Sequence, residues 1–252
     1  LQLADPLQAR IHLVRPVEPT GPVELPNLSS MDDPLSVLDR RENMMRDEEE
    51  PPPEPDDDLS AAAVQLCEAA RVVCSYRRLH GETGPILWEQ ALGMDMVVLP
   101  CYKSGGGISR AAAYLVSHPV TPILLCRDEV VAWRSLLLAY EPSAPGGRAL
   151  RLAGELSAEL NLSLDVVVAD PQRERARKRL HDVQRTLRAF HVEGELMLRE
   201  GRTEDVLETV ALEQHPSVLV VPLSHRCLLP WTTTGTIRRA LRFSSSLPLI
   251  VP

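Results

Sequence analysis

Two stretches of this sequence follow one pattern: G-E-T-G-P-I-L-W-E-Q-A-L at residues 81–92 and G-R-T-E-D-V-L-E-T-V-A-L at residues 201–212. Each copy has a glycine, a polar helix start and a helix with an apolar face. An apolar run then ends at a proline, M-V-V-L-P at Pro100 and V-L-V-V-P at Pro222. Self-similarity of this kind predicts a duplicated structural unit.

The similarity continues outward from both copies. After each proline come a loop, a short helix and a strand, P-I-L-L-C at 122–126 and P-L-I-V-P at 248–252. Upstream, the opening L-Q-L-A-D-P-L-Q-A-R-I-H-L-V resembles L-R-L-A-G-E-L-S-A-E-L-N-L-S-L from Leu150. The repeat is therefore about half the chain, which predicts two domains, 1–128 and 129–252.

The second copy alternates strands and helices. Apolar runs at 136–140, 164–169, 218–221 and 248–251 are typical of strands buried on both faces of a parallel sheet. A more polar strand is expected at 195–199, at a sheet edge. Helical spacing follows Ala149 to Leu160 and Ala176 to Phe190, and Asp170 before Pro171 is expected to cap a helix. This predicts an α/β fold of two tandem doubly wound, Rossmann-like domains with five-stranded parallel sheets.

The first copy differs in two places. Its opening strand is missing, so we expect residues upstream of Leu1, or another chain, to supply it. Residues 40–58, R-R-E-N-M-M-R-D-E-E-E-P-P-P-E-P-D-D-D, are acidic and rich in proline. They lack apolar groups for a core and donors for a sheet, so we interpret them as a solvated loop; an acidic interaction segment is the alternative.

Composition narrows the classes of function. The chain has 252 residues, 44% of them hydrophobic, and no apolar run long enough for a membrane span. A net charge of −8 argues against a nucleic-acid-binding surface over the whole molecule. Five scattered cysteines without a C-x-x-C pair indicate reduced thiols in the cytoplasm. The histidines show no zinc-ligand spacing, so no metal is expected.

The second half resembles the universal stress protein family. The residues L-L-L-A-Y-E-P-S at 136–143 and R-A-L-R-L-A at 148–153 look like that family's opening strand and alanine-rich helix. V-L-V-V-P, G-T-I-R-R-A-L-R at 235–242 and S-S-S-L-P-L-I-V-P look like its ending. The resemblance implies an adenine nucleotide α-hydrolase-like fold and a response to stress or starvation.

Some family members bind ATP through a loop after the fourth strand: Gly, two residues, Gly, nine residues, then Gly and Ser or Thr. The glycines let backbone N–H groups approach phosphates, and the last pair opens a helix. Here Pro222 and His225 replace the two glycines, whereas Gly235 and Thr236 remain. In the first copy Pro100 replaces the first glycine, and Gly105–Gly107 precede no Gly-Ser/Thr pair. We therefore expect no nucleotide in the first copy.

The resemblance also gives the candidate ligand contacts of the second copy. Arg226 would supply charge to a phosphate, and Glu141 stands where the family's opening turn has Asp. Thr236 capping a helix and His225-Arg226 in a surface loop are the alternatives. The candidate residues are Glu141, Ala169, Ser224, His225, Arg226, Gly235 and Thr236.

The arginines between Arg173 and Arg188 form a basic helix in an acidic chain, interpreted as a solvated face, with an anionic partner as the alternative. No catalytic constellation is recognisable. We predict a non-catalytic cytoplasmic stress-response module without a bound cofactor, whose terminal strands associate edge to edge, within one chain or between two. An ATP-binding switch using the second domain, with slow ATP hydrolysis, and a regulatory domain of a transporter or kinase stay open.

Overall fold

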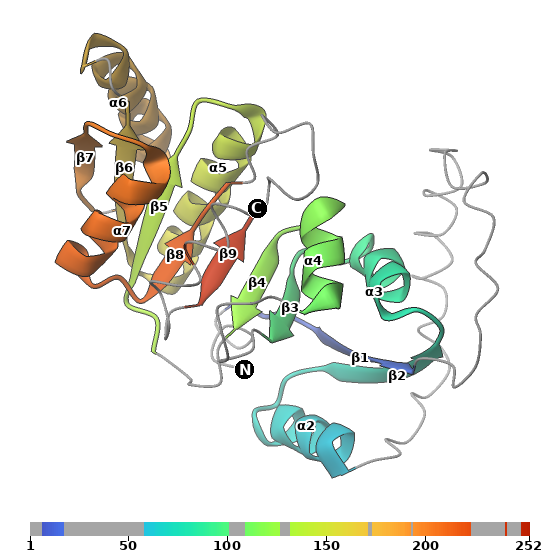
Figure 1. The fold of residues 1–252 in the computed structure, drawn as a ribbon. Coiled ribbons are helices and arrows are strands. Elements are labelled where there is room, and N and C mark those ends of the chain that lie inside the picture. Colours follow the sequence, from blue (N-terminus) through green and yellow to red (C-terminus); the bar gives the residue numbers. More distant parts are fainter. Residues whose placement is uncertain are drawn as a thin grey trace. The chain divides into compact units, whose positions relative to one another are not determined.

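The computed structural model describes residues 7–17, 58–100, 109–126, 132–170, 173–192, 194–222, 240 and 248–252. Two compact units make up the chain, Leu1–Asp95 and Met96–Pro252, and both contain strands and helices (Figure 1). None of the helices in these described ranges has the length and apolar composition that a membrane crossing requires.

The first unit contains a two-stranded parallel sheet. Its elements are β1 (Ile11–Val17), α2 (Asp58–Ala69), β2 (Cys74–His80) and α3 (Thr83–Ala91). The two strands pair from Ile11 opposite Cys74 to Val17 opposite His80. Parallel neighbours need a crossover, and α2 lies in that connection and packs against β2, while α3 packs against β1.

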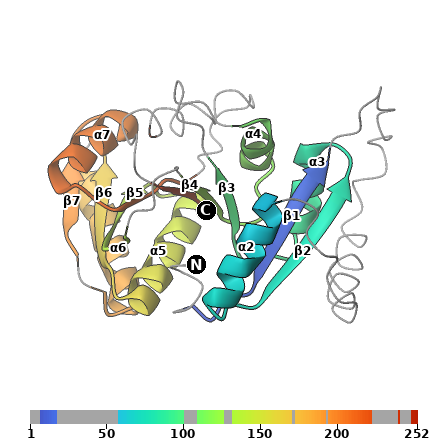
Figure 2. The ribbon, with the colours of Figure 1, turned by 90° about the horizontal axis from the view of Figure 1, so that it is seen from below.

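The second unit contains a seven-stranded sheet in the order β3-β4-β9-β8-β5-β6-β7. Figures 1 and 2 show α5 and α6 on one face of this sheet and α4 and α7 on the other. The elements are β3 (Val97–Pro100), α4 (Arg110–Ser117), β4 (Ile123–Cys126), β5 (Ser135–Tyr140), α5 (Ala144–Leu160), β6 (Ser163–Ala169), α6 (Arg173–Arg188), β7 (Leu196–Arg199), α7 (Thr203–Gln214), β8 (Val218–Val220) and β9 (Leu249–Val251).

The strands of the second half are all parallel to their neighbours within that half. In chain order they stand third, second, first, fourth, fifth, which is a doubly wound arrangement. The prediction of a doubly wound α/β fold is thus confirmed, including the polar strand at the edge. The core is centred on β5, where Leu136 to Ala139 are completely buried.

The two terminal strands of the copies lie side by side. β4 pairs with β9 antiparallel, from Ile123 opposite Val251 to Leu125 opposite Leu249. This confirms the edge-to-edge pairing expected for P-I-L-L-C and P-L-I-V-P within one chain. β4 also pairs with β3, and β9 with β8, so both edges of each strand are occupied. Association between separate chains stays a prediction.

The first copy is divided between the two sheets, which differs from the expected five-stranded sheet in each domain. β1 and β2 form the small sheet, whereas β3 and β4 belong to the seven-stranded one. By contact, β3 and β4 therefore group with the second half, although the repeat assigns them to the first. The boundary after residue 128, taken from the repeat, stays a prediction.

The repeat recurs in backbone geometry. Gly81 and Gly201 both adopt positive φ, +146° and +136°, two residues before α3 and α7 begin. A Cβ at Gly81 would lie 3.0 Å from the Ile86 side chain, and one at Gly201 would lie 3.2 Å from Val206. Glycine tolerates this conformation without a steric cost, so each copy turns into its helix in the same way.

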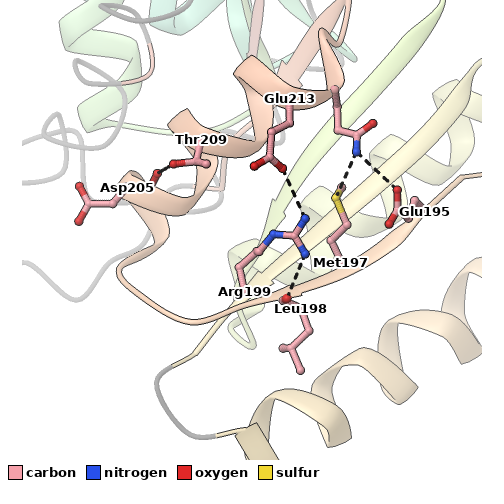
Figure 3. A network of polar contacts seen from close by, with 8 residues as sticks. Glu195, Met197, Leu198, Arg199, Asp205, Thr209 and Glu213 are labelled. Atoms are coloured by element: carbon pink, nitrogen blue, oxygen red, sulfur yellow. Dashed lines mark hydrogen bonds and ion pairs between the residues drawn. The ribbon is translucent and has the colours of Figure 1, made fainter.

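The outer strand β7 carries a network of polar contacts with α7 (Figure 3). Arg199 forms an ion pair with Glu213 at 3.4 Å and also donates to the Leu198 carbonyl at 3.3 Å. Gln214 donates to Glu195 at 3.5 Å and to the Met197 sulfur at 3.8 Å. Charged side chains along an edge strand discourage pairing with another chain.

Ser217 fastens the start of β8 to the start of β5. Its hydroxyl oxygen accepts hydrogen bonds from the Arg134 and Ser135 amides, both at 2.8 Å, and its O–H donates to the Ser135 carbonyl at 2.7 Å. Ser217 is buried, so water cannot readily replace these bonds. One side chain thus satisfies backbone groups more than eighty residues away in sequence.

We predict that Ser217→Ala lowers the free energy of unfolding by about 1 to 3 kcal/mol, because the Arg134 and Ser135 amides lose their acceptor on a buried side chain. Urea denaturation followed by circular dichroism measures this loss. Thr209→Ala is the control, since the exposed Thr209 hydroxyl only donates to the Asp205 carbonyl of its own helix. Equal stabilities of the two variants would contradict the role given to Ser217.

Candidate functional site

The strand order of the second half reverses between β5 and β8, which are parallel neighbours. β6 and β7 follow β5 on one side, and β9 follows β8 on the other. In open α/β sheets, ligands gather outside the carboxyl ends of the strands at such a reversal. The candidate site is therefore the edge where β5, β6 and β8 end, at Tyr140, Ala169 and Val220.

The turn from β5 into α5 lies at this edge and is tightly built. Ser143 caps α5 by accepting from the Gly146 amide at 3.1 Å, and its own amide donates to the Glu141 carbonyl at 2.9 Å. A Cβ on Gly146 would lie only 1.8 Å from that carbonyl oxygen. The close approach of two backbone segments therefore requires glycine at position 146.

Two of the candidate ligand residues lie in the described structure. Glu141 directly follows β5 and Ala169 ends β6, and since these strands are paired, both residues come to the same edge. Both are partly exposed. Their contact with a ligand stays a prediction.

Of the segment after β8 that would contact a phosphate, only the first two residues belong to the described ranges. Val221 and Pro222 follow β8 and are buried. Because proline has no N–H, position 222 offers no backbone donor to an anion. Ser224, His225, Arg226, Gly235 and Thr236 lie outside the described residues, as do Gly105–Gly107. Within the described ranges, no group of three or more His, Cys, Asp or Glu could hold a metal ion.

A buried carboxylate adjoins this edge. Asp170 follows β6, and its side chain is completely inaccessible to solvent. Arg179 forms a close ion pair with one carboxylate oxygen, and Arg175 approaches the other at 3.4 Å. The two arginines are four residues apart in α6 and so share a helix face. Together these residues hold the start of α6 against the end of β6.

Tyr140 stands beside this ion pair at the end of β5. Burial raises the pKa of its hydroxyl, the Asp182 carboxylate raises the pKa further, and Arg179 acts in the opposite direction. A raised tyrosine pKa keeps the O–H protonated at neutral pH. Tyr140 therefore brings a hydrogen-bond donor, not a base, to this part of the sheet edge.

The Asp170 cluster adds to one interpretation of the sequence. The arginines of α6 were expected to form a solvated face, and Arg175, Arg177, Arg185 and Arg188 are exposed. Arg179 is the exception among them at 23% exposed, and both Arg175 and Arg179 pair with Asp170. Asp170 was expected only as a helix cap. The available signal was an Asp-Pro pair at a strand end with arginines five and nine residues later. Spacing alone could not show that the helix turns these two side chains toward the sheet.

We predict that Asp170→Asn lowers the free energy of unfolding by roughly 3 kcal/mol, since it removes the charge between two arginines of which one is largely buried. Guanidinium denaturation measures the change. Asp182→Asn is the matched control, because Asp182 pairs with Arg185 at an exposed position and its loss should cost less than about 1 kcal/mol. If Asp170→Asn lowers the free energy of unfolding by less than the control does, the stabilising role given to the Asp170 ion pairs is wrong.

The glycine pair at the start of α5 offers a second matched test. Gly146→Ala should cost roughly 1 to 3 kcal/mol because the new methyl group meets the Glu141 carbonyl. A methyl group at position 147 would have no atom within 4 Å, so Gly147→Ala should stabilise the helix by about 1 kcal/mol. Thermal unfolding of the two variants gives the comparison. Similar midpoints would show that the turn is looser than these distances indicate.

No protein-family model and no curated protein sequence matches this chain. Solved structures do match it. A universal stress protein from Archaeoglobus fulgidus DSM 4304 is 12% identical with a TM-score of 0.70, and the match covers 96% of this chain and 85% of that chain. A Pseudomonas aeruginosa UCBPP-PA14 protein assigned to the same family is 17% identical with a TM-score of 0.62, covering 97% and 94%.

Shorter proteins match about half of this chain. One, a universal stress protein solved in complex with cAMP, is 18% identical with a TM-score of 0.43, and the match covers 48% of this chain and 98% of that chain. The identities are low throughout, so the similarity concerns the fold. The Archaeoglobus and Pseudomonas matches cover at least 96% of this chain and at least 85% of the matched chain. The chain therefore has the fold of the universal stress proteins, as the resemblance in its sequence predicts.

Proposed function

We propose that this chain is a non-catalytic stress-response module that binds or senses a small molecule at the carboxyl edge of the second half's sheet. The observation that carries the proposal is the reversal of strand order between β5 and β8. It brings Tyr140, Glu141, Ala169 and Pro222 to one edge, where the turn into α5 is fixed by Ser143 and Gly146.

The groups at this edge suit binding better than proton transfer. Asp170 is already engaged by Arg175 and Arg179, and a raised pKa keeps Tyr140 protonated. A general base needs a pKa near the working pH and access to its substrate. Asp170, fully enclosed, lacks that access, and Tyr140 lacks a suitable pKa. We therefore assign no catalytic residue.

The proposal includes weak or no triphosphate binding. Pro222 removes a backbone donor at the first position of the loop after β8, and His225 stands at the second glycine position. Backbone N–H groups are what a phosphate-binding loop contributes. We infer that the module works in the cytoplasm and without a tightly held nucleotide. We also infer that association between separate chains uses surfaces other than the β4 and β9 edges, which are paired with each other.

A second candidate is an adenine-nucleotide switch in the second half. The tight turn at Gly146 favours this candidate. The contact of Gly146 with the Glu141 carbonyl fixes the backbone at the sheet edge where Glu141 and Ala169 lie. In this reading, the ligand would bind to the segment from Leu223 to Gly235, with Gly235 and Thr236 at the phosphates. A regulatory domain of a transporter or kinase stays a third prediction, with no structural feature in its favour.

Thermal unfolding with and without millimolar ATP separates the first two candidates. We expect an unchanged midpoint, whereas ligand at 100 times its dissociation constant would add about 2.7 kcal/mol of stability. Inorganic triphosphate at equal ionic strength controls for general anion effects. A rise with ATP beyond that control, or adenine nucleotide carried through purification, would refute our first proposal and support the switch. In that event Glu141→Ala should reduce the rise.

A further inference from the structure

Cys67 and Cys74 lie on either side of the turn that joins α2 to β2. The turn is a Schellman motif: Arg71 has a φ of +56°, its amide donates to the Glu68 carbonyl, and the Val72 amide donates to the Cys67 carbonyl, both at 2.9 Å. β2 then begins at Cys74. The reversal therefore returns the chain past Cys67 within a few residues.

The packing of α2 on β2 brings the two thiols together. Cys67 faces inward and is 3% exposed, whereas Cys74 keeps partial contact with solvent. Their side chains lie within hydrogen-bonding reach of each other, and neither is in a disulfide. The arrangement is an accessible sulfur in contact with an enclosed one. All of it belongs to the first unit, so the inference is independent of the site proposed on β5 and β8.

We propose that Cys67 and Cys74 are a dithiol site that a hydroperoxide converts into an intramolecular disulfide. The Cys74 thiolate attacks the peroxide, the O–O bond breaks, and an alcohol or water leaves after taking up a proton. Cys74 is then a sulfenic acid. The Cys67 sulfur attacks the Cys74 sulfur, the S–O bond breaks, and the hydroxyl leaves as water with the remaining thiol proton. Two thiols lose two electrons in total, and one hydroperoxide gains them.

The environment of Cys74 determines the rate at which its thiolate attacks the hydroperoxide. Burial, contact with the Cys67 thiol and the nearby Glu68 carboxylate raise the pKa of Cys74 to about 12. Since only the thiolate attacks, the reaction should be slow at neutral pH. Its rate should rise about tenfold for each unit by which the pH increases toward that pKa. Once the sulfenic acid forms, the adjoining Cys67 competes well against a second peroxide.

The experiment uses the intact chain treated with hydrogen peroxide, quenched by alkylation and digested with trypsin. Arg71 lies between the two cysteines, so trypsin places them on separate peptides, residues 47–71 and 72–77. We expect these two peptides to become linked as the main product, and faster at pH 9 than at pH 7. Because wild-type protein gives this readout, the result does not depend on whether a cysteine variant folds.

Cysteine variants provide the matched controls. Cys126→Ser, at the end of β4, should leave the link unchanged, whereas Cys74→Ser should abolish it. In Cys67→Ser, the peptide 72–77 should accumulate as sulfenic or sulfinic acid. The proposal is overturned if wild-type Cys74 accumulates as sulfinic acid while Cys67 remains alkylatable. It is also overturned if Cys74 links mainly to another cysteine.

Discussion

A buried strand must have both of its backbone edges hydrogen-bonded, and in this protein β5 imposes that requirement on its neighbours. Leu136 to Ala139 are inaccessible to water, so every peptide group along them needs a partner on β6 or β8. Ser217 serves the same need at the strand's start, where Arg134 and Ser135 precede the pairing of β5 with β8. With β6 on one side of β5 and β8 on the other, the chain runs outward from β5 through β6 to β7 and then returns across β5 to β8. The reversal of strand order beside β5 follows from this path.

That reversal explains why several unrelated features gather at one edge. The cap of α5, the glycine packed against Glu141 and the ion pairs of Asp170 all lie where β5 and β6 end. At the carboxyl ends of parallel strands, backbone carbonyl groups and side chains all need partners at the same edge of the sheet. At this edge the Asp170 carboxylate is paired with Arg175 and Arg179.

Much of the architecture could be predicted from the sequence, because it depends on periodicity. The apolar runs predicted the strands of the second half, and the duplicated glycine stretch predicted two equivalent helix starts. In the structure both starts have a glycine at positive φ, Gly81 and Gly201. The pairing of β4 with β9 followed from treating the two chain halves as equivalent. Each of these features depends on local chemistry or on the symmetry of the repeat, and both can be recognised from the order of residues in the sequence.

Other features depend on side-chain direction or on contacts between distant segments. The destination of Arg175 and Arg179 is set by how α6 lies on the sheet, which helical spacing does not specify. Likewise the Cys67 and Cys74 contact depends on a left-handed Arg71, a residue with no special preference for that conformation. The division of the first copy between two sheets could not be seen from a repeat that counts elements only.

The antiparallel junction of β4 and β9 has a consequence for how the copies can change. In a dimer of identical chains, a substitution at such a contact appears on both sides at once. Here Leu124 and Ile250 face each other as separately encoded residues, so either can be altered while the other is kept. Because both copies lie in one chain, each half can therefore change without imposing the same change on the other.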